Sequence, residues 1–369
     1  MKRGLLFFSS HYPGVGGGET YLFELAKSLD SEFRIYFAEA GGNDTVASWI
    51  SELGYPLARL RYSLLGARKA AMQLKAVCEQ WDIDLIHLNN RRDAFLAYYL
   101  PERPKVMTIH TNFFASALGL SHNMRSLAML AALRIARDSI QEYITVTRYG
   151  AARLSGLLGI PIQRVHPIYN GLHPMRTTVN LAQMARRRLI CSIANLSRNK
   201  GLEFLIRALA LLSELPWECQ IVGDGSDRAR LESLVHRHQL QSRIHFTGTL
   251  PREQVFEILA HSRMMVLPTL YEGFPYSLLE AMSLGVPVIT TRVLGLPEII
   301  PEGKNGILVN PCEAHGLADA IHVLLTHDDL ALSMGREGRR LVETRFSLEQ
   351  MIGQTRDIYE ELLRERKAQ

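Results

Sequence analysis

Residues 268–298 read PTLYEGFPYSLLEAMSLGVPVITTRVLGLPE, and this segment decides the fold. Within it, Glu272 and Glu280 enclose seven residues that begin Gly273-Phe274-Pro275. We expect a strand to end at Pro268 and a loop to present Glu272. A helix should begin near Pro275, where proline is tolerated because its missing N–H has no helical partner. The amides of Gly273 and Phe274 would then face an anion or a sugar hydroxyl.

Short apolar runs alternate with longer amphipathic runs on both sides of this segment, which indicates parallel sheets flanked by helices. In the first half we expect strands at 4–10, 33–40, 84–89, 105–110, 143–147 and 164–170. In the second half we expect them at 189–196, 217–225, 244–248, 264–269 and 287–291. A chain of 369 residues exceeds the size of one hydrophobic core. The sequence therefore predicts two doubly wound, Rossmann-like α/β domains.

The domain boundary is expected near 171–188. Asn170-Gly171 is a turn signal because both residues tolerate positive φ. A last helix is expected from Ser347 to the chain end, with Gln350 as its capping-box partner. The predicted domains are 1–172, onto which the helix 347–369 packs back, and 173–346.

A glycine-rich loop, PGVGGGE at 13–19, follows the first strand and opens the first helix. Glycines there let an anion approach backbone N–H groups. A dinucleotide fingerprint counted from Gly14 would place a third glycine at Glu19, so the loop alone is a weak signal. A plain tight turn is the alternative interpretation.

Charge is unevenly distributed along the chain. The net charge is +5, with 19 basic and 14 acidic residues in 1–172 and 23 of each in 173–369. A basic first half suits an anionic membrane surface or an acidic substrate. Nucleic acid is not expected, because no basic cluster is interleaved with aromatic residues. The four cysteines have no metal-ligand spacing and suit a reducing cytosol.

Taken together, these segments resemble the retaining glycosyltransferases of the GT-B fold, specifically glycosyltransferase family 4. The resemblance covers nearly the whole chain and is most specific across 190–311. It rests on elements that occur in family order: the glycines at 16–18, Thr108-Ile109-His110, Asn170-Gly171, Lys200-Gly201, VGDG (222–225), FTG (246–248), the Glu–seven–Glu segment and PVITT (287–291). It implies an α/β GT-B fold in which two Rossmann-like domains face an interdomain cleft, the first binding the acceptor and the second the donor.

The resemblance also implies roles for particular residues. Catalytic positions correspond to Lys200, Glu272 and His110, although a satisfied histidine at a strand end is the alternative for His110. Asn195 stands where the family has an arginine, so Arg198 is expected to supply the second cation for the diphosphate. Donor-binding positions correspond to Gly16, Gly17, Asn195, Arg198, Lys200, Gly248, Glu272, Gly273, Phe274, Pro275, Leu279 and Glu280. Glu272 would bind sugar hydroxyls, and Glu280 the ribose.

The implied reaction is retaining transfer of a hexose-type sugar from a UDP-, GDP- or similar nucleotide sugar to a hydroxyl of a glycan or glycolipid acceptor. The implied setting is bacterial-type cell-surface polysaccharide or lipopolysaccharide synthesis, in the cytoplasm or at the inner face of the plasma membrane. No cofactor or metal is expected: Asp82-Ile83-Asp84 resembles a metal-binding Asp-x-Asp but leads directly into a strand. Two alternatives stay open, a catalytically silent partner subunit and a sugar-nucleotide 2-epimerase of the same fold.

Arg61, Arg68 and Lys75 lie seven residues apart and are expected to share one helix face. An apolar stripe of the same helix is expected at Leu64, Ala67, Ala71, Leu74 and Cys78. One interpretation is a solvated basic face on a packed surface helix. The other is contact of these three basic side chains with an anionic membrane.

Overall fold

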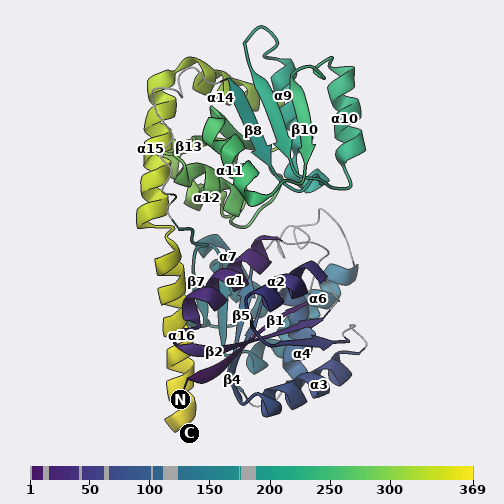
Figure 1. Cartoon of the computed structure of the whole chain (residues 1–369), viewed down its shortest axis with the longest axis vertical. Helices are drawn as coiled ribbons and strands as arrows, with labels where there is room; N and C mark the ends of the chain where they lie inside the picture. Colours follow the sequence, from purple (N-terminus) through teal and green to yellow (C-terminus); the bar gives the residue numbers. More distant parts are fainter. Residues whose placement is uncertain are drawn as a thin grey trace. The chain divides into compact units, whose positions relative to one another are not determined.

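The structure is a computed structural model that describes residues 2–10, 16–40, 44–61, 66–100, 103–110, 124–173, 175 and 188–368. The chain forms two compact units (Figure 1). Met1–Asn170 with Leu348–Gln369 form the N-terminal domain, and Gly171–Ser347 form the C-terminal domain. The division falls within two residues of the boundary expected from the sequence. Most of the expected junction, 176–187, lies outside the described residues.

The N-terminal domain is built on a parallel sheet of seven strands in the order β3-β2-β1-β4-β5-β6-β7. The strands are β1 (Arg3–Ser10), β2 (Phe33–Ala40), β3 (Leu57–Leu60), β4 (Ile83–Leu88), β5 (Lys105–Ile109), β6 (Glu142–Thr145) and β7 (Val165–Pro167). Six of them coincide with expected strands. The sequence analysis missed β3, an edge strand in which only Leu60 is buried and which contains the exposed Arg59.

Helices cover both faces of this sheet. One face packs against α3 (Ala67–Gln80), α4 (Ala94–Tyr99), α6 (Met124–Ala136) and α7 (Arg148–Leu158). On the other face, aromatic contacts join the sheet to α1 (Gly17–Leu29) and α16 (Leu348–Ala368). The remaining helix is α2 (Asp44–Glu52). The sheet is therefore apolar on both sides, as a parallel sheet requires.

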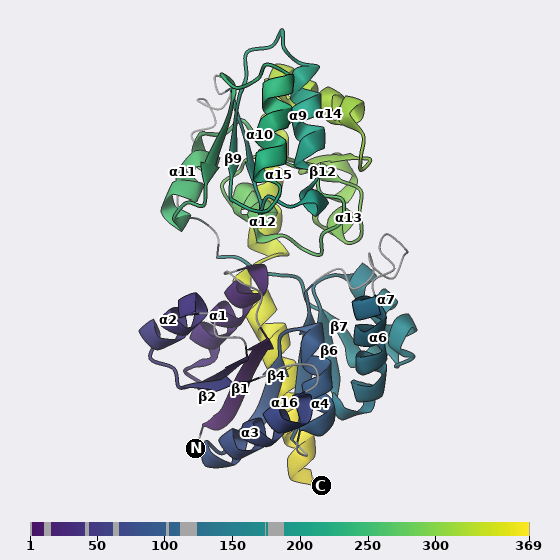
Figure 2. The same cartoon turned by 90° about the vertical axis from the view of Figure 1, so that its right-hand side faces the viewer.

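The last helix, α16, belongs to the N-terminal domain although it follows the C-terminal domain in sequence. It begins one residue after the predicted start at Ser347. Arg3 donates to the Leu363 carbonyl (2.8 Å), and the Tyr359 hydroxyl bonds to His87 of β4. These contacts fix the helix along the sheet (Figure 2).

The C-terminal domain has a parallel sheet of six strands in the order β10-β9-β8-β11-β12-β13. The strands are β8 (Leu189–Ile193), β9 (Glu218–Val222), β10 (Ile244–Gly248), β11 (Met264–Leu267), β12 (Val288–Thr291) and β13 (Gly306–Val309). Its helices are α9 (Leu202–Ala210), α10 (Arg228–Arg237), α11 (Arg252–His261), α12 (Tyr276–Ser283), α13 (Leu296–Ile299), α14 (Ala314–Thr326) and α15 (Asp328–Thr344). The sequence analysis missed only the edge strand β13.

The strand order reverses once in each sheet, between β1 and β4 and between β8 and β11. At such a switch point the loops that leave adjacent strands diverge and open a crevice at the carboxyl ends. The expectation of two doubly wound α/β domains is thus confirmed. The topology also marks where a ligand should bind in each domain.

One expectation about the basic helix is wrong. Helix α3 begins at Ala67, so Arg61 lies outside it, one residue beyond β3. Arg68, Lys69 and Lys75 are exposed on α3, and its buried stripe contains the expected Ala67, Ala71, Leu74 and Cys78. Leu64 lies outside the described residues. Among the described helices, none is both long enough and apolar enough to span a bilayer.

Candidate functional site

The switch point of the C-terminal domain brings together two loops that carry charged side chains. The loop after β8 leads through a short 3-10 turn, Arg198–Lys200, into α9. The loop after β11 runs from Pro268 to Pro275 and leads into α12. Because β8 and β11 are neighbours in the sheet, their carboxyl-end loops lie side by side.

Gly201 lets the two loops pack backbone against backbone. Its φ is +63°, in the left-handed region, and an added Cβ would lie 2.1 Å from the Pro268 carbonyl oxygen. The Leu270 amide donates to the Asn199 carbonyl (2.7 Å). The fully buried Thr269 hydroxyl lies 3.0 Å from that carbonyl and 3.1 Å from the Tyr271 carbonyl. A side chain at position 201 would separate the loops, which explains why glycine follows the lysine.

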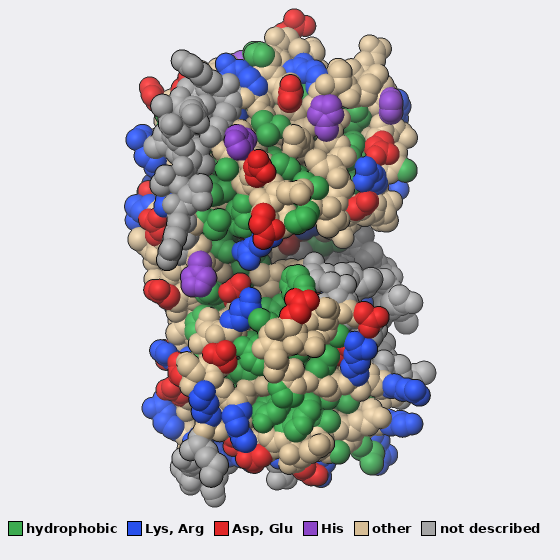
Figure 3. Space-filling view, in the orientation of Figure 1, with side chains coloured by type: hydrophobic (Ala, Val, Ile, Leu, Met, Phe, Trp, Pro, Cys, Tyr) green, Lys and Arg blue, Asp and Glu red, His purple; other side chains and the backbone are tan. Residues whose placement is uncertain are grey.

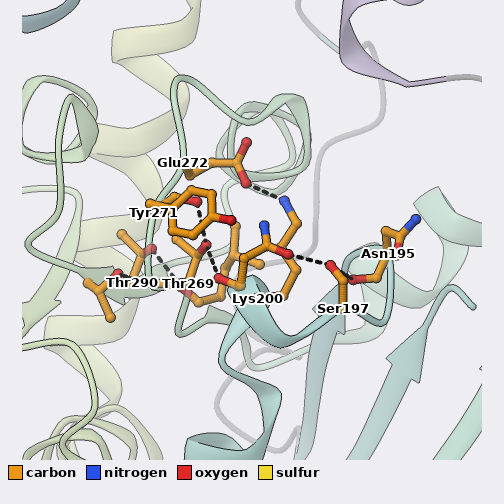
Figure 4. Close-up of polar contacts among 10 residues, drawn as sticks. Asn195, Ser197, Lys200, Thr269, Tyr271, Glu272 and Thr290 are labelled. Atoms are coloured by element: carbon orange, nitrogen blue, oxygen red, sulfur yellow. Dashed lines mark hydrogen bonds and ion pairs between the residues drawn. The ribbon is translucent and has the colours of Figure 1, made fainter. Parts of the chain in front are cut away.

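This packing brings Lys200 and Glu272 into direct contact (Figure 4). The Lys200 ammonium donates to Glu272 Oε2, and the two side chains are only 18% and 14% exposed. The two residues are 72 positions apart in sequence. An ion pair that is largely shielded from water is stronger than a surface pair, but each charge has also lost hydration. The net stability of the pair is therefore smaller than its shielded attraction alone.

Glu280 lies on α12, half-buried, eight residues after Glu272. Burial raises the pKa of its carboxyl, which Arg252 opposes from 3.9 Å. A partly desolvated carboxylate of this kind is stabilised by hydrogen-bond donors, and a pair of hydroxyls could supply them.

Some residues between the two glutamates are half-buried, such as Gly273, and others have buried side chains, such as Phe274 and Leu279. Helix α12 begins at Tyr276 with Pro275 at its N-cap, within one residue of the prediction. Phe274 is buried and packs edge-on against Phe346, at 5.2 Å between ring centroids, so only its backbone could contact a ligand. Leu279 is fully buried, so only its backbone could contact a donor. Gly273 is half-buried at the mouth of the loop.

Asn195 and Arg198 are both exposed on the loop after β8. A Cβ at Gly225 would approach Asn195 Oδ1 to 2.6 Å, so the 222–225 loop packs closely over Asn195. The pKa of the neighbouring Asp227 is lowered, first by its hydrogen bonds from Arg230 and in smaller part by the charge of Arg198. Arg198 is therefore close enough to Asp227 to act on its pKa. The Asp227 carboxylate, however, is already paired with Arg230.

Gly248 ends β10 at a φ of +73° and pairs with Gly223, whose amide donates to the Gly248 carbonyl (2.9 Å). A Cβ on Gly223 would lie 2.1 Å from the Ala194 carbonyl. The two glycines of VGDG thus allow close backbone packing against the loop after β8, whereas glycine at position 248 of FTG suits a left-handed φ.

At the N-terminal domain's switch point, Gly16 is the N-cap of α1 and Gly17 its first residue. The Gly16 amide donates to Glu19 Oε2 (2.9 Å), which is the glutamate half of a capping box, since glycine has no side chain to accept in return. This contact explains why glutamate occupies the position where a dinucleotide fingerprint has glycine. Residues 11–15 of the loop lie outside the described residues.

His110 follows β5 and meets the loop after β4. Its Nε2 lies 2.7 Å from Asn89 Oδ1, while Asn89 Nδ2 donates to the Gly18 carbonyl (3.0 Å). Because Asn89 Oδ1 only accepts, the proton is on Nε2, and Nδ1 therefore carries an acceptor lone pair. Burial lowers the pKa of His110 to about 4, so the ring is neutral at physiological pH. Asn89 thus fixes the orientation of the His110 ring, which a histidine that hydrogen-bonds a ligand would need.

Asp82 and Asp84 lie at the amino end of β4, whereas the switch-point loops follow the carboxyl ends of the strands. Asp84 Oδ2 accepts the Gly4 amide (2.8 Å), and Asp82 pairs with Arg34 (3.0 Å). Both carboxylates have structural partners, as their position before a strand indicated.

Two family models match the chain in tandem. Residues 15–176 match "Glycosyltransferase Family 4", and residues 180–341 match "Glycosyl transferases group 1". The chain is a group 1 glycosyltransferase. The two matches meet at the boundary between its domains, so both halves of this glycosyltransferase belong to the same family architecture.

Known proteins resemble this glycosyltransferase over three quarters or more of its length. N-acetyl-alpha-D-glucosaminyl L-malate synthase of Bacillus anthracis is 26% identical over 96% of this chain and 97% of its own. The putative colanic acid biosynthesis glycosyltransferase WcaL of Salmonella typhimurium is 26% identical over 77% of this chain and 73% of its own. The crystal structure of Anabaena HepE in complex with UDP-glucose is similar with a TM-score of 0.82, at 19% identity, over 97% of this chain and 99% of that one. The expected GT-B fold is confirmed.

Sequence reasoning missed the residues that hold the site together. Thr269 acts through its hydroxyl, Asn199 through its backbone carbonyl and Asn89 through its side-chain amide, and no charge or glycine marks them. The positions of Asn199 between Arg198 and Lys200, and of Thr269 at a strand end, were the only available signals.

Proposed function

We propose that this glycosyltransferase uses the C-terminal switch point to bind a nucleotide diphosphate sugar and transfers its sugar, with retention of configuration, to an acceptor hydroxyl. The Lys200–Glu272 contact carries the proposal. It places a cation for the diphosphate beside a carboxylate for the sugar hydroxyls, in one largely shielded position.

Stabilising the leaving group is the main chemical task. As the glycosidic bond breaks, negative charge develops on the departing nucleoside diphosphate, and fixed donors in a shielded site stabilise it. Lys200 would supply one positive charge, and Arg198, exposed on the same 3-10 turn, would supply the charge that Asn195 lacks. Amides at Gly273 and Phe274, before α12, would add neutral donors.

The two glutamates would bind rather than transfer protons. Glu272 would accept hydrogen bonds from hydroxyls of the sugar once the diphosphate has drawn Lys200 away. Glu280, with a pKa raised by burial, would accept from the vicinal hydroxyls of the ribose. Gly248 and its neighbours would pass beside the base through their backbone.

In the N-terminal domain, His110 would accept a sugar hydroxyl at Nδ1, and Gly16 and Gly17 would contact the diphosphate. The neutral ring fixed by Asn89 supports this assignment for His110. Acceptor recognition would fall to the same domain.

The acceptor we propose is a glycan or glycolipid, within cell-surface polysaccharide or lipopolysaccharide synthesis on the cytoplasmic side of the membrane. The similarity to WcaL, a putative colanic acid biosynthesis glycosyltransferase, supports this setting. The donor would be a UDP-sugar or a related nucleotide sugar, as the similarity to HepE, whose structure holds UDP-glucose, suggests. Since Lys200 and Arg198 would supply the charge, we propose that no metal is needed.

Nucleotide-sugar binding and turnover test the proposal. A thermal-shift screen against UDP- and GDP-sugars selects the donor, and release of the nucleoside diphosphate is then measured with and without EDTA. Lys200→Ala should reduce turnover by roughly 100-fold or more, as loss of a main charge-stabilising group does. The matched control is Lys304→Ala, at an exposed lysine of the same domain, which should be unchanged.

Full activity of Lys200→Ala, or loss of wild-type activity in EDTA, would contradict the corresponding part of the proposal. Conversion of the labelled donor to an epimeric nucleotide sugar, without sugar transfer, would favour the epimerase alternative instead.

A further inference from the structure

Helix α6 has an unusual outer face. Its inner side chains Met129, Leu133 and Ala136 are buried in the core of the N-terminal domain. On the outside, Leu127 is 65% exposed and Ile135 is 60% exposed, with the exposed Ala131 between them. Aliphatic side chains therefore occupy the outer face of α6 as well as its inner face, and exposed apolar surface of this kind favours contact with protein or lipid.

The apolar surface continues on the neighbouring helices. Helix α4 lies against both α6 and α3, and Figure 2 looks onto this layer. Tyr98 and Tyr99 at the end of α4 are 51% and 48% exposed, and their rings meet edge-on at 5.0 Å. Met72 of α3 is 67% exposed. Among the residues that the structure describes, ten large hydrophobic side chains are exposed, and five of them lie on these three adjacent helices.

Basic residues accompany this surface. Met72 has Arg68 and Lys69 one turn before it and Lys75 one turn after it on the same exposed side of α3. The sequences of α3, α4 and α6 together contain five basic residues and one acidic residue, Glu79. In Figure 3, basic side chains line the edge of the N-terminal domain on the side where Figure 1 places these helices.

This combination identifies the chemistry of the partner. A protein partner of matching shape would need an acidic, apolar surface, whereas an anionic bilayer offers negative headgroups directly above hydrocarbon. Basic side chains bind the headgroups, exposed aliphatic side chains enter the hydrocarbon boundary, and tyrosines favour the interface between the two.

We propose that α3, α4 and α6 form a membrane-docking surface, with Arg68, Lys69 and Lys75 on anionic headgroups and Met72, Leu127 and Ile135 inserted beneath them. The proposal rests on the proposed function, since a glycolipid acceptor would be reached from such a surface. It replaces the alignment of Arg61, Arg68 and Lys75 expected from the sequence, because Arg61 lies outside α3.

Vesicle binding of the full chain tests the proposal. Sedimentation would compare vesicles of phosphatidylglycerol and phosphatidylcholine in equal parts with vesicles of phosphatidylcholine alone. We expect strong preference for the anionic vesicles. Arg68→Glu with Lys69→Glu should lower this partition by at least 25-fold, from about fivefold for each lost basic contact. Leu127→Ser with Ile135→Ser should lower it about tenfold, at low and at high salt alike.

Leu211→Ser and Arg237→Glu, at exposed positions of the C-terminal domain, are the matched controls and should bind as the wild type does. Equal binding of the wild type to both vesicles, or unchanged binding of either double variant, would overturn the proposal. So would a wild-type dimer without lipid that Leu127→Ser with Ile135→Ser dissociates, since the surface would then bind a second copy.

Donor turnover without vesicles separates this proposal from the proposed function. Both double variants should keep wild-type release of nucleoside diphosphate, because these residues lie outside the switch-point loops. Inactivity of the wild type on every nucleotide sugar would instead count against the proposed function.

Discussion

At the scale of single residues, the site shows a lysine and a glutamate that neutralise each other. Lys200 and Glu272 form an ion pair, although our proposal assigns one to a diphosphate and the other to sugar hydroxyls. Donor binding must therefore break this contact. The free energy of the pair opposes the binding of any anion that offers nothing to Glu272.

This competition predicts effects of opposite sign for Glu272→Gln. The nucleoside diphosphate without its sugar should bind about tenfold more tightly, because Lys200 no longer has a carboxylate partner. Transfer from the complete donor should fall by roughly 10- to 100-fold, because an amide binds the hydroxyls less strongly than a carboxylate. Calorimetry with the free diphosphate and turnover with the donor measure the two effects.

The matched control is Glu257→Gln, at an exposed position on α11, which should change neither quantity. Weaker binding of the free nucleoside diphosphate to Glu272→Gln would show that the pair does not restrain Lys200.

At the scale of elements, the site depends on how closely two loops approach. Gly201 and Thr269 join the loop after β8 to the loop after β11 through backbone contacts. Neither residue needs to touch a ligand. Their function is to set the distance between Lys200 and Glu272.

Gly201→Ala should therefore lower both stability and activity. The new Cβ would lie 2.1 Å from the Pro268 carbonyl, at a left-handed φ of +63°, so the loops must separate. We expect a loss of roughly 1–3 kcal/mol in the free energy of unfolding and a larger proportional loss in kcat than in KM. Urea unfolding and steady-state kinetics measure the two effects.

Gly156→Ala provides a contrasting control, because this glycine lies within α7 and a Cβ there would meet nothing within 4 Å. It should stabilise the protein by roughly 0.5–1 kcal/mol and leave kinetics unchanged. Equal behaviour of the two alanine variants would contradict the proposed loop contact.

At the scale of the whole molecule, a buried polar network ties the C-terminal helix to the N-terminal domain. The Thr108 hydroxyl donates to Tyr21, so it accepts from His87 Nε2 (2.8 Å), and His87 Nδ1 accepts from Tyr359 of α16. Burial lowers the pKa of His87 to about 3. The histidine is therefore neutral in the folded protein.

Both lowered histidine pKa values predict that acid destabilises the N-terminal domain. Below about pH 6.5 the unfolded chain takes up protons at His87 and His110, while the folded domain does not until about pH 3 and 4. The free energy of unfolding should therefore fall with pH across this window, by roughly 1.4 kcal/mol per pH unit for His87 and less for the partly exposed His110.

Tryptophan fluorescence can follow this domain separately. In Trp217→Phe the remaining tryptophans, Trp49 and Trp81, lie in the N-terminal domain. Its urea midpoint should drop between about pH 7 and about pH 5, and the drop should shrink when His87→Gln is added. A midpoint that is the same at both pH values would refute the prediction.

The sequence by itself determined the class of fold, eleven of the thirteen strands in the described residues, and the chemical types at the site. Alternating apolar and amphipathic runs, with glycines where backbones must approach, are local patterns that reflect local physics. They predicted a helix near Pro275, whereas the role of Lys200 was implied by the family resemblance. The edge strands β3 and β13 were missed because each has a single buried side chain, Leu60 or Val309, and therefore no continuous buried apolar run.

Only the tertiary structure decided which side chains meet. The contact of Lys200 with Glu272 depends on β8 and β11 being neighbours across a reversed strand order, which no local pattern encodes. Packing also decided that the side chain of Leu279 is buried in the core while that of Arg198 is exposed. It also explains the outer face of α6, because exposure is a property of the packed domain and not of the helix sequence.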